Sequence, residues 1–205
     1  MSDDPIVTAE APPPTESTVA VLLAAGAGSR FRGPTHKLLT SLPGEEDRTI
    51  FEVSLSVALA AGFSKVIVVS GAADIPAPLV RDPRVVLVHN HRWSEGQAHS
   101  LTVGIAEAQR LGASAVVVGL ADQPFISAEA WRLVATSDSP IAVATYGGRR
   151  GNPVRLAAST WALLPTTGDT GARDLITLRP ELVSQVDCPG SAADIDTEED
   201  LAQWT

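Results

Sequence analysis

Cysteine, lysine and aromatic residues are all scarce in this sequence. Cys188 is the only cysteine among 205 residues, which excludes an internal disulfide and a cysteine-rich zinc site. No apolar run approaches the roughly 18 residues that a membrane-spanning helix needs. The net charge of −9 speaks against the broad basic surface that binds nucleic acid or anionic membranes. Since a single cysteine favours a reducing compartment, we expect a cytoplasmic protein. We expect it to bind neither nucleic acid nor membranes.

The amino terminus has neither the positive charge nor the apolar segment of a signal peptide. Residues 1–17 contain two early aspartates and several prolines, and this composition predicts a disordered tail. The chain as a whole is 44% hydrophobic, enough to bury one core. The sequence therefore predicts one domain, residues 18–205, after a short tail.

Short apolar runs alternate with helical patterns along the body of the chain. A capping box at Thr49 and Glu52 predicts a helix that ends at Gly62, and a second helix is predicted from Gly96 to Leu111. The apolar runs predict parallel strands buried on both faces, at residues 19–23, 66–69, 85–88, 115–120 and 141–144. This alternation, with right-handed crossovers, predicts a three-layer α/β/α sandwich with a mostly parallel sheet, whose ligands bind at the carboxyl ends of the strands.

A glycine-rich turn follows the first predicted strand and has the composition of a phosphate cradle. Gly26 and Gly28 leave the backbone free to take positive φ angles and to bring its N–H groups close to an anion. Arg30 and Lys37 supply full positive charges. Only two lysines occur in the chain, so a lysine at the end of this turn favours a functional interpretation over a solvated turn, which remains the alternative.

Two familiar phosphate loops do not match this turn. A dinucleotide fingerprint requires glycine where Phe31 stands, three residues after Gly28. The P-loop pattern requires Lys-Ser/Thr after Gly33, where the sequence has Pro34 and Thr35. The loop therefore supports neither a Rossmann dehydrogenase nor a P-loop NTPase.

Two acidic segments are candidate metal ligands. Asp122 follows the most apolar predicted strand, where its carboxylate could hold Mg²⁺ together with substrate phosphates; the alternative is a turn aspartate before Pro124. Asp194 and Asp196 flank Ile195 in a short extended segment, which points both carboxylates the same way. Asp196 or Thr197 could equally be the N-cap of a following helix.

Histidine pairs offer weaker candidates. His89 and His91 share a face if their strand continues, and Glu95 lies one helical turn from His99. Neither pair has a further ligand in view, so we expect solvated or packing roles. Trp93 stands next to the GQAHSL string and could border a nucleotide pocket.

Six strings, in this order, resemble the molybdenum cofactor cytidylyltransferases, a branch of the MobA-like nucleotidyltransferases. They are LLAAGAGSRF with Lys37, WSEGQAHSLTVGI, LADQPFI, GGRRGNPV, GDTGARDLI and DIDTEEDL, and the resemblance covers residues 19–204. The resemblance implies a Rossmann-like fold and transfer of a nucleoside monophosphate to the terminal phosphate of molybdopterin, with release of pyrophosphate. The Ala-Ala of LAAG and the Gln of DQP are similar to the cytidylyl branch, which favours CTP over GTP.

The resemblance also implies roles for individual residues. Arg30, Lys37 and Asp122 would be catalytic, and Asp122 and Asp196 would hold Mg²⁺. The nucleotide would contact Leu23, Ala24, Ala25, Gly26, Gly28, Ser29 and Ser100. The acceptor would contact Arg150, Asn152 and Arg173. These residues lie in segments 149–153 and 168–173, which a surface hairpin turn and a helix start explain nearly as well.

The loop departs from the family pattern at two points. Three residues separate Gly33 from Lys37, where the family usually has two, and Phe31-Arg32 replaces the usual Met-Gly. We still expect Lys37 to be the phosphate lysine. Implied partners are the two small-molecule substrates and a molybdoenzyme or its chaperone.

Two other function classes stay open. A nucleotidyltransferase could use the same donor site with a sugar or alcohol phosphate as acceptor. A noncatalytic module could deliver or sense the cofactor, and this class would be favoured by the loss of Lys37, Asp122 or Asp196, all of which are present.

Overall fold

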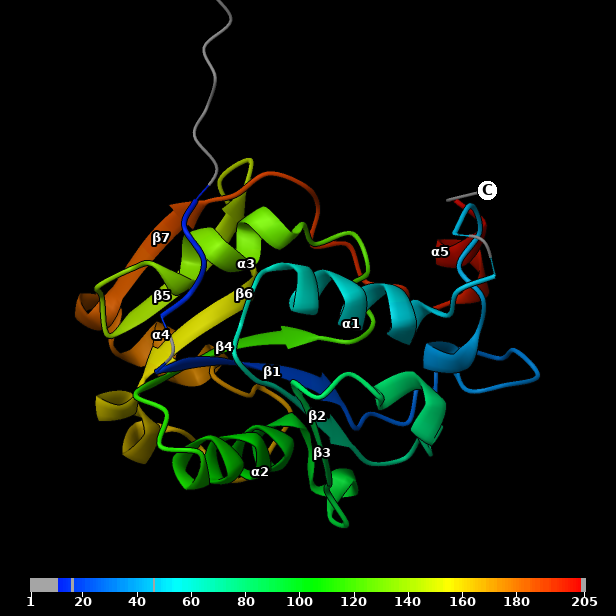
Figure 1. Ribbon diagram of the computed structural model, residues 1–205, viewed down its shortest axis with the longest axis horizontal. Coiled ribbons are helices and arrows are strands. Elements are labelled where there is room, and N and C mark those ends of the chain that lie inside the picture. Colours follow the sequence, from blue (N-terminus) through cyan, green and yellow to red (C-terminus); the bar gives the residue numbers. More distant parts are fainter. Residues whose placement is uncertain (1–10, 16, 46, 204–205) are drawn as a thin grey trace, which may run out of the picture.

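A computed structural model describes residues 11–15, 17–45 and 47–203 as one α/β domain built on a seven-stranded sheet (Figure 1). The sheet order is β3-β2-β1-β4-β6-β5-β7. The strands are β1 (Thr18–Ala24), β2 (Val66–Ser70), β3 (Val85–His89), β4 (Ala115–Leu120), β5 (Ile141–Tyr146), β6 (Arg149–Ala157) and β7 (Val183–Asp187). Of these described strands only β6 runs antiparallel to its neighbours, so the mostly parallel sheet is confirmed.

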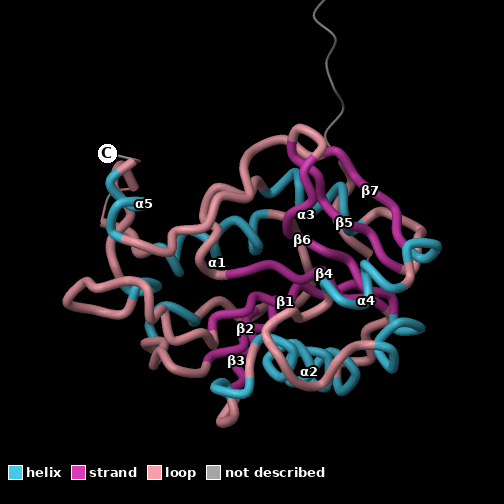
Figure 2. The backbone as a smooth tube through the Cα atoms, turned by 180° about the vertical axis from the view of Figure 1, so that it is seen from behind, coloured by secondary structure: helices cyan, strands magenta, loops and turns pink. Residues whose placement is uncertain are grey.

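Helices cover both faces of the sheet, which gives the predicted three layers (Figure 1). The α-helices are α1 (Ile50–Ala60), α2 (Gln97–Arg110), α3 (Ala128–Ala135), α4 (Arg173–Leu178) and α5 (Glu198–Ala202). Short 3-10 turns occur at η1 (Lys37–Leu39), η2 (Ala77–Val80), η3 (Trp93–Glu95), η4 (Ala158–Leu163) and η5 (Pro180–Leu182). Figure 2, viewed from behind, shows α2 beside β3 and β2 on one side of the sheet.

The side chains of β1 alternate between two hydrophobic cores, as a doubly covered strand requires. Leu22 packs with α1 and α3 on one face, whereas Val21 packs with α2 and α4 on the other. Every residue of β1 is buried. The predicted helix starts are also confirmed: Thr49 and Glu52 form the capping box of α1.

One strand prediction differs from the structure, and two strands were not predicted. β3 is an edge strand and not a doubly buried one, and Leu87 is 43% exposed. β6 and β7 were not predicted. β6 begins with polar residues and contains Pro153, and β7 alternates polar with apolar residues, so neither gives the continuous apolar run of a buried strand.

Ala11 and Ser17 lie in the predicted tail, residues 1–17, and form hydrogen bonds to the domain. The main-chain carbonyl of Ser17 accepts hydrogen bonds from the N–H groups of Ser114 and Ala115, and the N–H of Ala11 donates to Oε1 of Glu129 at 3.0 Å. These contacts tie the end of the predicted tail to the domain. Residues 1–10 and 16 lie outside the described residues.

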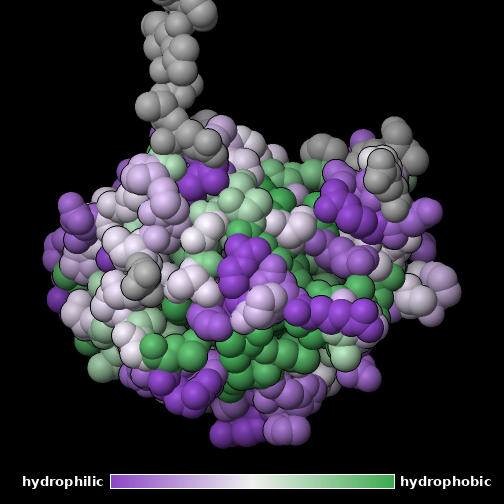
Figure 3. All heavy atoms as spheres, in the orientation of Figure 1, coloured by the Kyte–Doolittle hydropathy of each residue, from purple (hydrophilic) through white to green (hydrophobic). Residues whose placement is uncertain are grey.

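In the view of Figure 1, hydrophilic residues lie over most of the periphery, and the largest hydrophobic area lies below the centre (Figure 3). Among the described residues, none of the helices has the length and apolar character needed to cross a membrane.

Candidate active site

The glycine-rich turn and Asp122 meet at the carboxyl ends of neighbouring strands. The turn follows β1, Asp122 follows β4, and these two strands pair in parallel. Between them and the start of α2 lies a cleft of about 540 Å³. Its lining includes all the residues predicted for the nucleotide, its phosphates and the metal: Leu23, Ala24, Ala25, Gly26, Gly28, Ser29, Arg30, Lys37, Ser100, Asp122 and Asp196.

The two glycines of the turn serve different purposes. Gly28 has a φ of 61°, and a Cβ there would lie 3.1 Å from Cγ of Lys37, so both backbone and packing require glycine. Of these two glycines, only Gly28 uses the freedom to take a positive φ. A Cβ at Gly26 would nevertheless meet nothing within 4 Å. Glycine at this position leaves open space where a ligand could approach the backbone.

His36 connects the turn to the short helix that carries Lys37. Its Nδ1 accepts a hydrogen bond from the main-chain N–H of Leu38 at 3.3 Å, and its Nε2 lies 3.0 Å from the carbonyl oxygen of Gly26. The first contact uses Nδ1 as the acceptor, and the second pairs Nε2 with a carbonyl oxygen, which can only accept. This bridge holds the longer loop so that Lys37 still reaches the cleft.

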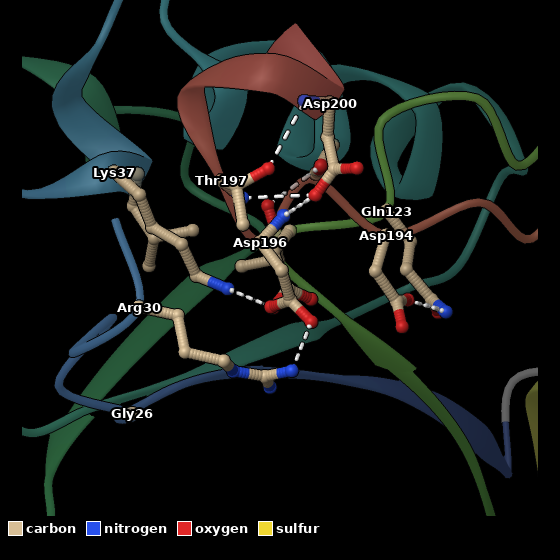
Figure 4. Close-up of polar contacts among 12 residues, drawn as sticks. Gly26, Arg30, Lys37, Gln123, Asp194, Asp196, Thr197 and Asp200 are labelled. Atoms are coloured by element: carbon tan, nitrogen blue, oxygen red, sulfur yellow. Dashed lines mark hydrogen bonds and ion pairs between the residues drawn. The ribbon is translucent and has the colours of Figure 1, made fainter. Parts of the chain in front are cut away.

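Lys37 lies between two carboxylates that are far apart in the sequence. Its Nζ is 2.5 Å from Oδ2 of Asp122 and 3.0 Å from Oδ1 of Asp196, and the residue is only 7% exposed. Nη1 of the exposed Arg30 is 2.9 Å from the other oxygen of Asp196 (Figure 4). The cluster therefore contains two cations and two anions at the mouth of the sheet.

The charges of this cluster shift two pKa values. Burial alone lowers the pKa of Lys37, but the charge of Asp122 and the hydrogen bonds to Asp122 and Asp196 outweigh it, so the pKa is raised and the lysine stays charged. Burial raises the pKa of the neighbouring Asp194 carboxyl, and the negative charges of Asp122 and Asp196 add to this rise.

One oxygen of Asp122 is suited to a metal ion. Oδ1 of Asp122 is buried and has no hydrogen-bond partner among the described residues, whereas Oδ2 is held by Lys37. A buried carboxylate oxygen without a partner is costly unless a ligand completes it. Mg²⁺ prefers one or two carboxylates together with substrate phosphates, and Asp122 with Asp196 provides such a set. The residues therefore fit the metal.

The segment after β7 leaves Asp196 free for the cluster. Thr197, not Asp196, caps α5, and Asp200 completes a capping box with it (Figure 4). The main-chain N–H of the buried Ile195 donates to the carbonyl of Asp122 at 3.0 Å, which anchors the segment beside β4. Asp194 also lines the cleft, but its carboxylate accepts from Nε2 of Gln123 and does not contact Lys37.

The residues predicted for the acceptor line a second cavity of about 290 Å³. Arg150 and Asn152 belong to β6, and Arg173 begins α4. Arg173 also lines the first cleft, so the two spaces adjoin. The hairpin and the helix start that the sequence offered as alternatives are both present, and the three side chains nevertheless share one cavity.

Gln123 connects the acidic segment before α5 to β6, a role that was not predicted from the sequence. Its Nε2 donates to the carbonyl of Ala192 at 3.0 Å, and its Oε1 accepts from Nδ2 of Asn152 at 2.9 Å. Gln123 is therefore connected to both the acidic segment and β6. Its signals in the sequence were its place directly after Asp122 and the similarity of the DQP string to the cytidylyl branch.

The histidine pairs do not form metal sites. The rings of His89 and His91 contact each other edge to face, with centroids 4.6 Å apart, and Glu95 pairs with Arg92. Over the described ranges no group of three or more His, Cys, Asp or Glu side chains could hold a metal ion. Trp93 lines the first cleft as the sequence suggested.

The family model of the MobA-like NTP transferase domain matches residues 20–186. The chain belongs to this family. It is therefore a member of a nucleotidyltransferase family, as predicted, and the match includes the glycine-rich turn, Lys37 and Asp122. The match ends before Asp196, so the family model itself does not cover the second carboxylate of the cluster.

Two curated relatives span nearly the whole chain of this MobA-like protein. Nicotine blue oxidoreductase from Paenarthrobacter nicotinovorans is 34% identical over 88% of this chain and 93% of its own length. Purine catabolism protein PucB from Bacillus subtilis is 30% identical over 89% of this chain and 93% of its own.

A solved structure of similar fold is Rv0371c from Mycobacterium tuberculosis. It is 27% identical with a TM-score of 0.74, and the alignment covers 91% of this chain and 96% of that chain. Rv0371c has also been solved in complex with manganese, at 25% identity, 91% and 97% coverage and a TM-score of 0.71.

Proposed function

We propose that this protein is a cytidylyltransferase that transfers CMP from CTP to the terminal phosphate of molybdopterin and releases pyrophosphate, with Mg²⁺ as cofactor. The observation that carries the proposal is the bridge from Lys37 to both Asp122 and Asp196 beside an open glycine-rich turn. Such a cluster supplies cations for a triphosphate and carboxylates for the metal that accompanies it.

The proposed chemistry needs positioning and charge more than acid–base catalysis. The acceptor's phosphate oxygen attacks the α-phosphorus in line with the leaving pyrophosphate, and no covalent enzyme intermediate forms. The exposed guanidinium of Arg30 and the ammonium of Lys37 stabilise the negative charge that grows on the phosphates. Bound Mg²⁺ on Asp122 and Asp196 would neutralise further charge on the same oxygens.

The second cavity supports an acceptor with its own anionic group. Arg150 and Arg173 provide planar guanidinium groups that can bind phosphate oxygens through two parallel hydrogen bonds. Leu101, Val118 and Val143 form an apolar part of the lining. A phosphorylated acceptor with a flat ring system, whose faces can pack on apolar side chains, matches this combination. The same lining could accept a sugar or alcohol phosphate, so acceptor identity is part of the test.

The first experiment identifies the nucleotide. The thermal stability of the protein is measured with each of the four NTPs, with and without Mg²⁺. A ligand at 100 times its Kd adds about 2.7 kcal/mol to the free energy of unfolding. We expect the largest rise in Tm for CTP with Mg²⁺. A larger rise with GTP would contradict the cytidylyl assignment while keeping the nucleotidyltransferase assignment.

The second experiment identifies the acceptor by pyrophosphate release from CTP. Molybdopterin is compared with a sugar phosphate and an alcohol phosphate under the same conditions. We expect release only with molybdopterin. Release only with another phosphate would overturn the acceptor, and CTP binding without turnover on any acceptor would favour the noncatalytic delivery module.

The name of one relative, nicotine blue oxidoreductase, makes reduction a further outcome to test. NADH and NADPH are therefore added to the stability panel. Phe31 occupies the place of the third fingerprint glycine, so we expect neither to stabilise the protein. Stabilisation by a reduced dinucleotide and not by CTP would contradict the proposal.

A further inference from the structure

Asn90 joins the end of β3 to the start of α2 through a buried side-chain amide. Asn90 is 1% exposed, and its Oδ1 accepts a hydrogen bond from the main-chain N–H of Arg92 at 2.9 Å. The same oxygen lies 2.9 Å from Nδ1 of His99. Its Nδ2 donates to Oγ of Ser100 at 3.0 Å. Each polar atom of the amide therefore has a partner.

The direction of these hydrogen bonds is fixed by the main chain. The N–H of Arg92 can only donate, so the amide atom that faces it must be oxygen. The amide nitrogen of Asn90 therefore faces Ser100, and Oγ of Ser100 must accept there. Within the described part of the chain, no acceptor takes the proton of the Ser100 hydroxyl.

Ser100 lies in the wall of the first cleft. It belongs to the first turn of α2. Trp93, Ser94 and Gln97 line the same cleft, and so does the glycine-rich turn. Ser100 is 3% exposed, so a ligand that covers it removes its remaining access to water. An O–H group that is left without an acceptor on ligand binding costs free energy, and this cost selects between ligands.

We propose that Asn90 is a positioning residue that makes the Ser100 hydroxyl a hydrogen-bond donor to a carbonyl oxygen of the nucleotide base. This inference rests on the proposed cytidylyltransferase function. Cytosine carries a single carbonyl group, at position 2. A base that presented an N–H group to Ser100 would place two donors against each other, so the arrangement selects for an acceptor on the ligand.

The test compares the Kd of CTP with that of 2-thio-CTP, in which sulfur replaces the carbonyl oxygen, by isothermal titration with Mg²⁺. In the unmodified protein we expect CTP to bind about tenfold more tightly, the effect of one hydrogen bond. In Ser100→Ala the ratio of the two Kd values falls to near one. In Ser100→Thr, which keeps a hydroxyl, the preference remains.

Asn90→Asp tests the positioning role with little change of shape. The new carboxylate still accepts from the N–H of Arg92 but cannot donate to Ser100. The Ser100 hydroxyl therefore donates its proton to the carboxylate and no longer offers it to the cleft. At pH 8 a carboxyl beside N–H donors is ionised. We expect the preference for CTP over 2-thio-CTP to disappear in this variant. The double variant Asn90→Asp/Ser100→Ala should show no further change in the ratio of the two Kd values.

His99→Ala is the matched control, because it removes one partner of Asn90 without affecting the bond to Ser100. The tenfold preference should persist in this variant. The inference is overturned if Ser100→Ala keeps the preference, if a folded Asn90→Asp keeps it, or if the unmodified protein binds both nucleotides equally. Failure of the unmodified protein to bind CTP at all overturns the proposed function first, and this inference with it.

Discussion

The ammonium of Lys37 lies 2.5 Å from the carboxylate of Asp122, although 85 positions separate the two residues in the sequence. Lys37 is nearly buried, so this ion pair is held in a setting of reduced solvent screening. The same nitrogen contacts Asp196 at 3.0 Å. The lysine therefore occupies the position between two carboxylates that a divalent cation could share, and this has consequences for catalysis and for metal binding.

Replacement of Asp122 should abolish metal-dependent turnover. Asp122→Asn keeps the size of the side chain but removes the charge of the buried oxygen that has no protein partner. We expect kcat for pyrophosphate release to fall at least about 100-fold, with Tm little changed. Asp74→Asn, an exposed substitution outside the cleft, is the control and should keep full activity. Equal activity of the two variants would contradict the assignment of Asp122.

Replacement of Lys37 should separate metal affinity from catalysis. Lys37→Ala leaves Asp122 and Asp196 without their shared ammonium, and the two carboxylates then attract a divalent cation more strongly. We expect Mg²⁺, titrated without nucleotide, to bind at least about tenfold more tightly, while pyrophosphate release is lost. Unchanged Mg²⁺ affinity would show that the lysine and the metal do not compete for these oxygens.

The two glycines of the turn should respond differently to alanine. Gly28→Ala forces a side chain into a left-handed conformation, which costs about 1–2 kcal/mol, and presses on Lys37. Gly26→Ala has open space and should leave Tm unchanged, yet its Cβ would occupy space proposed for the nucleotide phosphates. Thermal unfolding and CTP titration of both variants check this. If Gly26→Ala binds CTP normally, the phosphate lies elsewhere.

Cys188 should be unreactive in the folded protein. Burial raises the pKa of its thiol from 9.0 to about 11, so the thiolate forms only when the pH rises well above the range in which a free cysteine reacts. We expect iodoacetamide to label it slowly at pH 8, and rapidly once the protein is unfolded. Cys188→Ala should retain pyrophosphate release. Rapid labelling of the folded protein would contradict this burial.

Local sequence patterns were sufficient to predict much of the fold. The apolar runs that became β1, β2 and β4 are buried from both sides, so both faces of each strand must be apolar, and this pattern is visible in the chain itself. The capping box of α1 involves residues three apart, and its chemistry is equally local. β6 and β7 escaped prediction because their pairing, not their composition, makes them strands.

The sequence by itself determined the residue types of the site and the position of each at the end of an element: glycines and cations after β1, an aspartate after β4, an aspartate before α5. Only the tertiary structure decided which of them meet. The parallel pairing of β1 with β4 brings Lys37 to Asp122, and the hydrogen bond from Ile195 to the carbonyl of Asp122 brings Asp196 to the same place. These contacts join residues far apart in the chain, so they depend on sheet order and packing and on no local pattern. The hydrogen-bond direction of Ser100 also depends on the tertiary structure, because Asn90, which follows β3, donates to Oγ of Ser100 in α2.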